Sequence, residues 1–390
     1  MEKKKILFYV SGIGLGGVEK VILEVLKGID KEKYDIKLGL NNENENFFEN
    51  EIPKEINYQY MVNRKIIEKT LMYKKRKNIL NKLFYSYMLW YEKYIAKKKF
   101  LKFAEDRDIL IDFKSGDYLR LINLFKDKKK MVWLHGEIIN LTKYKKNKKK
   151  FIDNLKQCNK IILVCNEMKN EFIKNIKGLE EKLKVIYNPF NIKKILKMAS
   201  DYSEENIESK KLLKENYILM VSRFDLKAKD FFSLFNAVKL LENLDFKLFL
   251  LGNGIEEKKI LEKEIKNLKL EDKIIILEER KNPYPWIKNA KVLVHSSKTE
   301  GFGLVLVEAQ ILETLVIATK CKIGPEEILN KGKSGILVEV GDYKEIAKQI
   351  KKVLENEYLK EEYLIEMKKS ILRFESRNII NEIEKTIDAL

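Results

Sequence analysis

The sequence is poor in cysteine and has no long apolar run. Its cysteines, Cys158, Cys165 and Cys321, are odd in number and lack metal-ligand spacing, which argues against both a disulfide framework and a zinc site. No stretch approaches the roughly eighteen apolar residues that a membrane-spanning helix needs. The start, Met1 to Lys5, leads into a strand pattern rather than a signal peptide. We therefore expect a cytoplasmic protein in a reducing compartment.

Acidic residues are in the minority, since 59 Asp and Glu stand against 78 Lys and Arg, a formal net charge of +19. Such an excess favours an anionic partner, for example a nucleotide, a nucleic acid or an anionic membrane. A Lys-, Asn- and Ile-rich genome composition explains the excess equally well. The charge by itself therefore does not choose a partner.

Strand-like and helix-like patterns alternate along the chain, whose length suits about two to three domains. Short apolar runs rich in branched residues form two sets, and a polar, Lys- and Glu-rich segment separates them. The first set is Ile6–Val10, Ile36–Leu40, Ile109–Phe113, Met131–Leu134, Ile161–Cys165 and Leu183–Tyr187, and the second is Tyr217–Val221, Phe246–Leu251, Lys273–Leu277, Lys291–His295, Leu315–Thr319 and Gly335–Val338.

This alternation predicts an α/β protein with two Rossmann-like domains, each around a parallel sheet. We expect the first domain over 1–190, a linker over 191–216 and the second domain over 217–370. The tail over 371–390 has helical periodicity, and we expect it to pack back on the first domain. A basic, aromatic stretch over 64–103 suits helices on the first domain.

A glycine-rich loop, Ser11 to Gly17, follows the first predicted strand and leads into an amphipathic helix. Glycines let the backbone approach a ligand closely, and the free amides of a helix N-terminus attract anions. The spacing of Gly12, Gly14 and Gly17 fits the dinucleotide fingerprint, but Asn41 stands where that fingerprint needs an acidic residue. The loop is therefore either part of a ligand site or only a tight turn.

The sharpest signal lies in the second domain, in Thr299-Glu300-Gly301-Phe302-Gly303-Leu304-Val305-Leu306-Val307-Glu308-Ala309. The helix in this segment is apolar on nearly all sides and should be buried, and Glu308 with it. A buried carboxylate is costly without partners, and the two adjacent hydroxyls of a ribose would satisfy both oxygens. Glu300 stands just before the helix, where two glycines leave amides open to a phosphate or sugar. The other interpretation is that Glu308 pairs with a lysine or lies at a helix edge.

Two basic residues follow the first strand of the second domain. Arg223 stands at the carboxyl end of that strand, where parallel sheets bind ligands, and its guanidinium suits a diphosphate. Lys229 would add a second positive charge. Either residue alone is more typical of a solvated surface base, but beside the two glutamates a phosphate site is favoured.

These motifs are similar to those of the retaining glycosyltransferases of family 4, which have the GT-B fold. The resemblance covers nearly the full length and includes Gly16 to Lys20, Tyr187 to Pro189, and Leu251 to Gly254. Its most specific part is the pair of glutamates, Glu300 and Glu308, with seven residues between them. The resemblance implies two Rossmann-like domains that face each other across a cleft.

The resemblance also implies roles for individual residues. Arg223 and Lys229 would neutralise the donor diphosphate, Glu308 would hold the nucleotide ribose, and Glu300 would position the transferred sugar as a catalytic residue. The other expected donor-binding positions are Gly16, Gly17, Gly301, Phe302, Gly303 and Leu304.

One departure from the family pattern concerns the lysine. The family usually has Gly-Arg and a lysine five residues beyond, whereas here Ser222 precedes Arg223 and Lys229 lies six residues beyond. Lys227 is therefore the alternative to Lys229.

Both histidines of the chain end predicted strands. His135 follows a first-domain strand and would face the cleft, near the point where the family often has a histidine beside the transferred sugar. We expect His135 to be catalytic, the alternative being a core histidine. His295 precedes two serines, and we interpret it as structural or as a support for site residues.

We expect neither a metal nor another cofactor. Asp106-Arg107-Asp108 has the spacing of a metal-binding Asp-x-Asp motif, but it stands before its strand, which is the wrong edge of a parallel sheet for a ligand. We interpret this motif as a solvated turn.

The sequence thus predicts a glycosyltransferase that moves a sugar with retention from a nucleotide-diphosphate sugar, UDP-linked by our expectation, to a glycan or lipid-linked glycan in surface polysaccharide synthesis. The basic stretch over 64–103 either docks on the anionic inner face of the membrane or is an ordinary solvated face. A nucleotide-sugar epimerase of the same fold is the rival enzyme. A nucleic-acid-binding protein is disfavoured, because no binding module or orderly basic stripe is recognisable.

Overall fold

The structure is a computed structural model, and it describes residues 2–43, 46–75, 78–137 and 148–390. The chain divides into two compact units. The first unit comprises 1–164, 169–189 and 379–390, and the second comprises 165–168 and 190–378. No described helix combines the length and the apolar character that crossing a bilayer requires.

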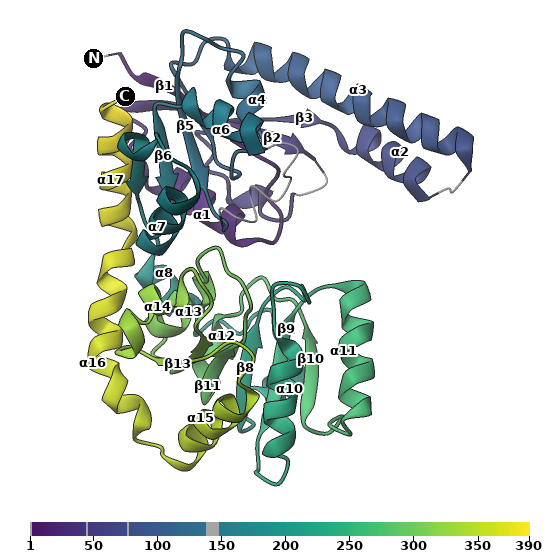
Figure 1. Cartoon of the computed structure of the whole chain (residues 1–390), viewed down its shortest axis with the longest axis vertical. Helices are drawn as coiled ribbons and strands as arrows, with labels where there is room; N and C mark the ends of the chain where they lie inside the picture. The colour runs from purple at the N-terminus through teal and green to yellow at the C-terminus, as the bar shows by residue number, and fades with distance from the viewer. Residues whose placement is uncertain (1, 44–45, 76–77, 138–147) are drawn as a thin grey trace. The chain divides into compact units, whose positions relative to one another are not determined.

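The first unit is built on a seven-stranded parallel sheet in the order β3-β2-β1-β4-β5-β6-β7 (Figure 1). The strand order reverses between β1 and β4, as in doubly wound nucleotide-binding folds. The strands are β1 (Lys4–Val10), β2 (Tyr34–Asn42), β3 (Asn57–Val62), β4 (Ile109–Asp112), β5 (Lys129–Leu134), β6 (Lys160–Leu163) and β7 (Leu183–Val185). The helices are α1 (Gly17–Gly28), α2 (Arg64–Lys75), α3 (Ile79–Ala104), α4 (Leu119–Ile122), α6 (Lys148–Lys156) and α7 (Asn166–Asn175), with 3-10 turns η1 (Glu49–Glu51) and η2 (Glu180–Lys182).

Residues that alternate along the central strands bury both faces of this sheet. Leu7 and Tyr9 of β1 point to one face, where they join a cluster with Phe100 and Phe103 of α3. Ile6 and Phe8 are equally buried and, by the two-residue period of a strand, point to the other face. Burial on both sides explains why these strands are continuous apolar runs in the sequence.

The C-terminal helix α17 (Ser376–Asp388) brings the end of the chain to the first unit. Ile380 packs so closely on Gly28 that a Cβ there would lie 2.7 Å from its Cγ1. Asp388 accepts a hydrogen bond from the Tyr34 hydroxyl at 2.8 Å and pairs with Lys33. The tail therefore contacts α1 and β2 directly.

The second unit repeats the architecture with a six-stranded parallel sheet in the order β10-β9-β8-β11-β12-β13. The order again reverses, here between β8 and β11. The strands are β8 (Tyr217–Val221), β9 (Lys247–Gly252), β10 (Ile274–Glu278), β11 (Val292–His295), β12 (Val316–Thr319) and β13 (Ile336–Val338). The helices are α8 (Ile192–Met198), α9 (Ile207–Leu212), α10 (Phe231–Leu240), α11 (Ile255–Asn267), α12 (Tyr284–Asn289), α13 (Leu304–Ile311), α14 (Pro325–Ile328), α15 (Tyr343–Glu355) and α16 (Leu359–Ile371), with 3-10 turns η3 (Asn330–Gly332) and η4 (Leu372–Phe374).

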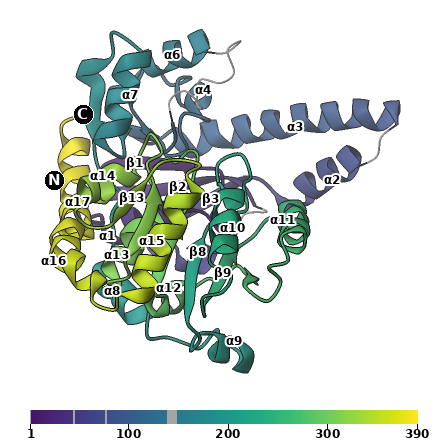
Figure 2. The same ribbon diagram turned by 60° about the horizontal axis from the view of Figure 1, so that its bottom comes forward.

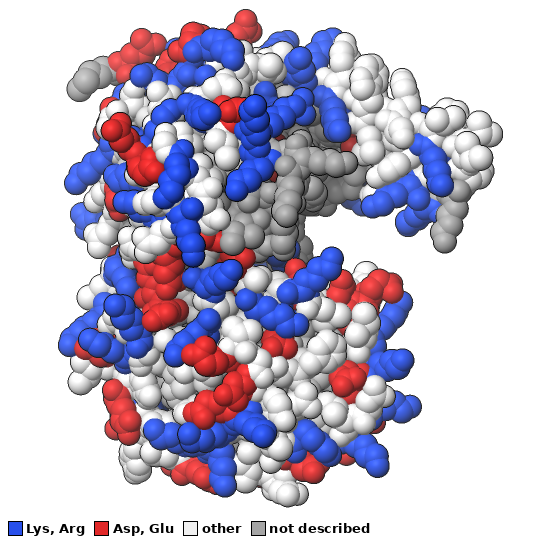
Figure 3. All heavy atoms as spheres, viewed as in Figure 1, with Lys and Arg blue, Asp and Glu red and all other residues white. Residues whose placement is uncertain are grey.

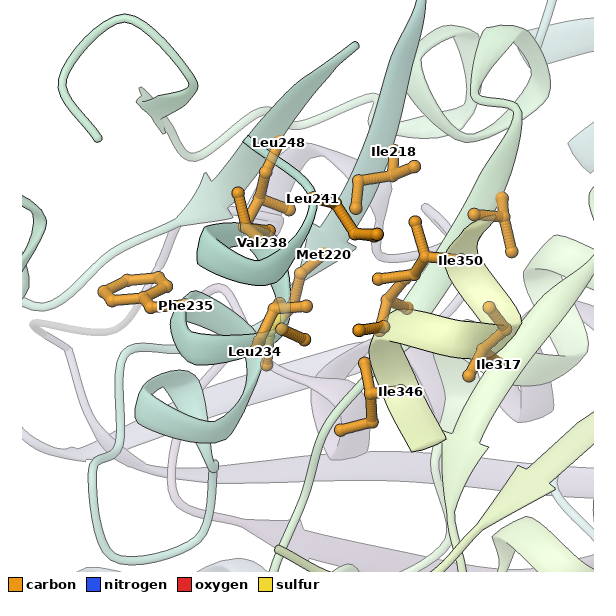
Figure 4. Packing of buried hydrophobic residues seen from close by; sticks show 14 of the residues in the cluster. Ile218, Met220, Leu234, Phe235, Val238, Leu241, Leu248, Ile317, Ile346 and Ile350 are labelled. Atoms are coloured by element: carbon orange, nitrogen blue, oxygen red, sulfur yellow. The ribbon is translucent and has the colours of Figure 1, made fainter. Parts of the chain in front are cut away.

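The core of the second unit lies between one face of this sheet and helices α10 and α15, which lie side by side (Figures 1 and 2). Figure 4 shows Ile218 and Met220 of β8 directed toward Leu234 of α10 and Ile350 of α15. All four side chains are essentially inaccessible to solvent. This packing fixes the sheet whose carboxyl edge carries the candidate site.

The segment expected as a linker over 191–216 forms helices α8 and α9 and belongs to the second unit. Glu205, between these helices, accepts a hydrogen bond from the buried Trp286 indole at 2.7 Å. Asn282 donates to the carbonyl of Met198 at 2.8 Å. The polar residues of this segment therefore bind the second unit, and its high Lys and Glu content reflects exposed helix faces rather than an extended connection.

Candidate functional site at the carboxyl edge of the second sheet

The two loops that carry the expected phosphate and sugar residues meet at the point where the strand order of the second sheet reverses. One loop follows β8 and the other follows β11, which are adjacent strands. The loops are hydrogen-bonded to each other, because Lys229 and Ser297 form an antiparallel bridge and the Lys298 amide donates to the Ala228 carbonyl at 2.8 Å. In doubly wound sheets, ligands bind at this switch point.

Glu300 is the centre of a buried polar cluster. Its Oε1 accepts a hydrogen bond from Ser297 Oγ at 2.7 Å, lies 2.7 Å from His295 Nε2, and contacts the ammonium group of Lys229. The side chains of Glu300 and Lys229 are each 12% exposed, and that of His295 is 2% exposed. We call Lys229, His295, Ser297 and Glu300 the Glu300 cluster.

The charges of the Glu300 cluster keep its carboxylate ionised. Burial raises the pKa of Glu300, but the positive charge of Lys229 and the hydrogen bond with His295 outweigh it and leave this pKa below its ordinary value. Burial and the charge of Lys229 lower the pKa of His295, although Glu300 opposes them. At neutral pH the cluster therefore holds an ammonium–carboxylate pair beside a neutral imidazole.

Arg223 is exposed at the start of the loop that follows β8, and its side chain makes no hydrogen bond or ion pair with another described residue. The neighbouring Ser222 Oγ is buried and has no hydrogen-bond partner in the described part of the chain. Of the two candidate lysines, Lys227 is exposed, whereas Lys229 contacts Glu300. The loop therefore offers the guanidinium of Arg223 to a ligand.

Glu308 lies on α13, whose last six residues are buried, and is itself only 6% exposed. Tyr284 of α12 donates its hydroxyl proton to Glu308 Oε1 at 3.2 Å. Helix α13 is short and, apart from Glu308 and Gln310, apolar, which matches the expectation from the sequence. The helix begins after Gly303, whose φ of 97° is in the left-handed region that glycine tolerates.

Two close backbone contacts shape these loops. A Cβ on Gly324 would lie 1.8 Å from the carbonyl oxygen of Phe302, inside the Gly301–Leu304 segment. A Cβ on Gly252, at the end of β9, would lie 1.8 Å from the carbonyl oxygen of Ser222. Gly252 belongs to the Leu251 to Gly254 motif, so this motif packs against the backbone at the start of the Arg223 loop.

The first unit carries the remaining expected residues at the corresponding edge of its own sheet. Gly16 precedes α1 and Gly17 begins it, and a Cβ on Gly16 would lie 2.1 Å from Glu19 Oε2, so a side chain there would displace that carboxylate. Glu19 is 6% exposed and pairs with Lys114 at 2.8 Å. The glycine loop therefore frames a buried ion pair, a contact that the sequence did not predict.

His135 follows β5, and its backbone amide donates to Ser115 Oγ at 2.9 Å. Burial lowers the pKa of His135 to about 3, helped by the charge of Lys114. The ring nitrogen Nε2 is buried and has no hydrogen-bond partner in the described ranges. Because the imidazole also donates a hydrogen bond to the backbone of Phe113, neutral His135 presents Nε2 as a hydrogen-bond acceptor.

Asp112 ends β4 and is completely buried. It accepts backbone hydrogen bonds from Lys114 at 2.9 Å and from Tyr118 at 2.8 Å. Burial nevertheless raises the pKa of Asp112 to about 7. This carboxyl group therefore changes charge near neutral pH.

The structure thus brings Lys229 and Glu300 into contact and puts Arg223, the Gly301–Leu304 segment and Glu308 on the same unit. His135, Gly16 and Gly17 lie on the other unit. Sequence reasoning missed the direct contact of His295 with Glu300 and the hydrogen bond from Tyr284 to Glu308. The available signal for the first was the position of His295 at a strand end, five residues before Glu300.

The Asp-x-Asp motif makes internal contacts. Asp106 pairs with Lys37 at 2.9 Å and with Arg107, and Asp108 accepts a hydrogen bond from the backbone amide of Lys5 at 2.9 Å. These contacts lie at the amino ends of β1 and β4, opposite the edge that carries His135.

One group of potential metal ligands occurs among the described residues, formed by Cys165, Glu167 and Glu327. Glu327 accepts hydrogen bonds from the backbone amides of Asn166 and Glu167 at 3.0 and 2.9 Å, and Glu167 accepts one from Gly324. Each glutamate therefore binds backbone amides at the start of the other's helix. These contacts account for the proximity of the two carboxylates without a metal.

Comparison with known proteins identifies the class of the second unit. Residues 202–370 match the family described as glycosyl transferases group 1. The unit that carries the Glu300 cluster and Glu308 is therefore similar to the group 1 glycosyl transferases. The resemblance to glycosyltransferases that the sequence motifs indicated is confirmed, and retaining family 4 is consistent with this match.

Two relatives illustrate the extent of the similarity. A 4-alpha-N-acetylgalactosaminyltransferase from Campylobacter jejuni, named for an N-acetylgalactosamine-N,N'-diacetylbacillosaminyl-diphospho-undecaprenol acceptor, is 32% identical over 173 residues, which is 44% of this chain and 47% of that protein. The chain thus spans about half the length of the curated relatives it matches first. An uncharacterized glycosyltransferase from Haemophilus influenzae is 25% identical over 389 residues, 98% of each chain.

Solved structures show the same fold over the whole length. HepE from Anabaena, in complex with UDP and glucose, superposes with a TM-score of 0.79 at 20% identity and covers 99% of this chain and 100% of its own. TarM of Staphylococcus aureus superposes with a TM-score of 0.73 at 15% identity, over 98% and 99% of the two chains. The α/β fold with two parallel sheets is therefore the GT-B fold, as the sequence predicted.

Proposed function

We propose that this protein transfers a sugar from a nucleotide-diphosphate sugar, UDP-linked, to a lipid-linked or surface glycan acceptor, with retention of the anomeric configuration. The match of residues 202–370 to the group 1 family supports the reaction class. The UDP in the HepE complex supports the nucleotide, and the undecaprenol-linked acceptor in the name of the Campylobacter relative supports the acceptor class. Because undecaprenol is a long apolar chain, an acceptor of this kind lies in a lipid bilayer.

The observation that carries the proposal is the gathering of charged side chains at the switch point of the second sheet. Arg223 is exposed and available to a ligand, while Lys229 and Glu300 are nearly buried. Buried charges cost several kcal/mol unless they are paired or bind a ligand. A nucleotide diphosphate would engage the two cations, and its ribose hydroxyls would engage Glu308.

The roles follow from these positions. Arg223 and Lys229 stabilise the negative charge that develops on the leaving diphosphate as the glycosidic bond breaks, a contribution typical of preorganised charges. Glu308 accepts hydrogen bonds from the ribose. Glu300 accepts hydrogen bonds from hydroxyls of the transferred sugar, since it stays ionised. His135, neutral at pH 7, hydrogen-bonds to the sugar or the acceptor through Nε2.

The test is turnover of a panel of UDP-sugars with an undecaprenol-linked acceptor. Glu308→Gln and Arg223→Ala are each expected to lower kcat/KM by about two to three orders of magnitude, the usual effect of losing one such interaction. Lys227→Ala is the matched control, because Lys227 is an exposed lysine of the same loop. It should leave turnover within about twofold, as surface substitutions usually do.

The products decide between this proposal and the epimerase. Transfer gives a lengthened acceptor in equal amount to free UDP, and NMR of the new linkage reports whether the configuration is retained. Isomerised donor without acceptor consumption would contradict the proposal, as would full activity of both the Glu308 and Arg223 variants.

A further inference from the structure

Helix α3 has two apolar faces, and only one of them is covered. On one face Ala96, Phe100 and Phe103 are buried in the core of the first unit, and Met88 is buried further along the helix. In the part of α3 before Ala96, Met88 is the only buried residue. The helix has 26 residues, so it is about 39 Å long at 1.5 Å per residue. Its first half therefore extends beyond the sheet, with α2 beside it (Figures 1 and 2).

Contacts between the two helices hold this arm together. The rings of Tyr73 on α2 and Phe84 on α3 stack at 5.3 Å between centroids, and Thr70 of α2 donates a hydrogen bond to Glu92 of α3. Figure 1 shows both helices extending to the same side of the first unit. We call α2 and α3 together the helical arm.

The uncovered face of the arm is an aromatic and aliphatic stripe. Its members share one side of α3 because their spacing follows the helical repeat, and each is at least half exposed. They are Ile79, Leu83, Tyr87, Trp90 and Tyr94, with exposed fractions between 50% and 78%. The rings are preorganised, since Trp90 stacks on Tyr94 at 5.6 Å between centroids. A continuous exposed stripe of this kind marks an interaction surface.

Positive charge accompanies the stripe. Residues 64–104 contain thirteen Lys and Arg but only two Glu. Lys82, Lys93, Lys97 and Lys98 of α3 are all exposed and lie within a turn or so of the stripe. Figure 3 shows the arm with Lys and Arg beside uncharged surface and very little acidic surface. The occupant of this surface is therefore anionic as well as apolar.

We propose that the helical arm docks the protein on an anionic lipid bilayer, with the stripe in the interfacial layer and the lysines against the lipid headgroups. Trp and Tyr favour this layer because each ring has an apolar body and a polar group. Lysines beside an apolar helix face are the pattern of interfacial helices. A second copy of the chain fits less well, because its own arm carries the same positive excess and would repel.

The proposed function gives a reason for this docking, since a lipid-linked acceptor lies in the same bilayer, and only that reason rests on the proposed function. The binding itself needs neither donor nor acceptor. It can therefore be tested on the full-length protein without any assay of sugar transfer, and failure of one proposal is distinguishable from failure of the other.

The tryptophans provide a specific probe. The chain has three, of which Trp133 and Trp286 are inaccessible to solvent and Trp90 is 58% exposed. Vesicles of equimolar phosphatidylcholine and phosphatidylglycerol should shift the emission of Trp90 to the blue, and lipids brominated on the acyl chain should quench it. Trp90→Phe should remove both responses while the protein still sediments with the vesicles. Vesicles of phosphatidylcholine alone should bind far more weakly.

Substitutions on the arm test the contributions of the lysines and of the aromatic rings separately, by vesicle sedimentation. Lys93→Glu/Lys97→Glu/Lys98→Glu should weaken partitioning at least about a hundredfold, because each lysine near an anionic surface contributes roughly a fivefold gain. Trp90→Ser/Tyr94→Ser should weaken it by about tenfold per ring lost.

Matched substitutions on the second unit are the controls. Lys263→Glu/Lys266→Glu changes two exposed lysines of α11, and Ile255→Ser/Tyr358→Ser removes two apolar side chains that are 80% and 73% exposed. Neither should change partitioning by more than about twofold. The proposal is overturned if the protein stays in the supernatant with anionic vesicles at low salt, if the control variants weaken binding as much as the arm variants, or if Trp90 becomes buried through self-association or binding to single-stranded RNA instead.

Discussion

The contact between Lys229 and Glu300 predicts that removing the charge of a site residue strengthens nucleotide binding. In the structure, the Glu300 carboxylate holds the same ammonium group that the proposed function gives to the donor diphosphate. A diphosphate must therefore compete with Glu300 for Lys229. Glu300→Gln keeps the shape of the side chain but removes its charge, so this variant should bind UDP more tightly than the natural protein.

The magnitude follows from the contacts. A hydrogen bond to a charged group contributes about 1.5–3 kcal/mol, of which a neutral amide retains roughly half. The part of the Lys229–Glu300 interaction that the amide loses no longer opposes UDP binding. This corresponds to about tenfold tighter UDP binding, or roughly 1.4 kcal/mol. The same substitution leaves Lys229, whose side chain is 12% exposed, without its anion, which should cost on the order of 3 kcal/mol of unfolding free energy. Added UDP should recover part of that loss by linkage.

Titration calorimetry with UDP and urea unfolding with and without UDP measure both quantities. Lys229→Met is expected to weaken UDP binding, and in the double variant Glu300→Gln should no longer improve it. Turnover of a UDP-sugar should fall in Glu300→Gln, because the carboxylate that positions the sugar is gone. Weaker UDP binding by Glu300→Gln, or an equal gain in the presence of Lys229→Met, would refute the reasoning.

Two further predictions concern stability. Gly324→Ala places a methyl group 1.8 Å from the Phe302 carbonyl at a φ of 98° and should cost about 2–4 kcal/mol in urea unfolding, whereas Gly178→Ala, at a φ of 79° with no atom within 4 Å of the new Cβ, should cost only about 1 kcal/mol. Burial raises the pKa of Asp112 from 3.8 to about 7, so the folded state binds an extra proton between these values. Stability from this group is therefore complete below pH 4 and is lost as the pH rises through 7, by on the order of 3–4 kcal/mol, and Asp112→Asn should flatten the profile of unfolding free energy against pH. Equal costs for the two alanine variants, or a profile unchanged by Asp112→Asn, would contradict these expectations.

Most strands were predictable because both faces of a parallel sheet are buried. The central strands are therefore apolar at nearly every position, and their ends in the structure agree with the sequence within a few residues. Strand β3 (Asn57–Val62) was missed because it lies at the sheet edge, where its first residues are exposed and polar. An edge strand with one open side does not need the apolar run on which the prediction depended.

The candidate site was predictable as a set of residues but not as a set of contacts. The positions of Arg223 and Glu300 after strands and of Glu308 in an apolar helix follow from local pattern. The contact of His295 with Glu300 does not, because it depends on how the loop after β11 folds back on the strand end. The choice between Lys227 and Lys229 is a similar case, since only the path of the β8 loop determines which ammonium group reaches the carboxylate.

The two sheets use their switch points differently, and the difference bears on function. In the first unit, Glu19 pairs with Lys114 at 2.8 Å under the glycine loop. In the second unit, Lys229 and Glu300 are paired as well, but Arg223 beside them is exposed and makes no ion pair within the described residues. A buried pair contributes little to stability compared with apolar residues of the same size, so folding alone does not explain why charges collect at this edge. The exposed guanidinium of Arg223 does have an explanation in binding, because a diphosphate supplies a negative charge with which it can pair.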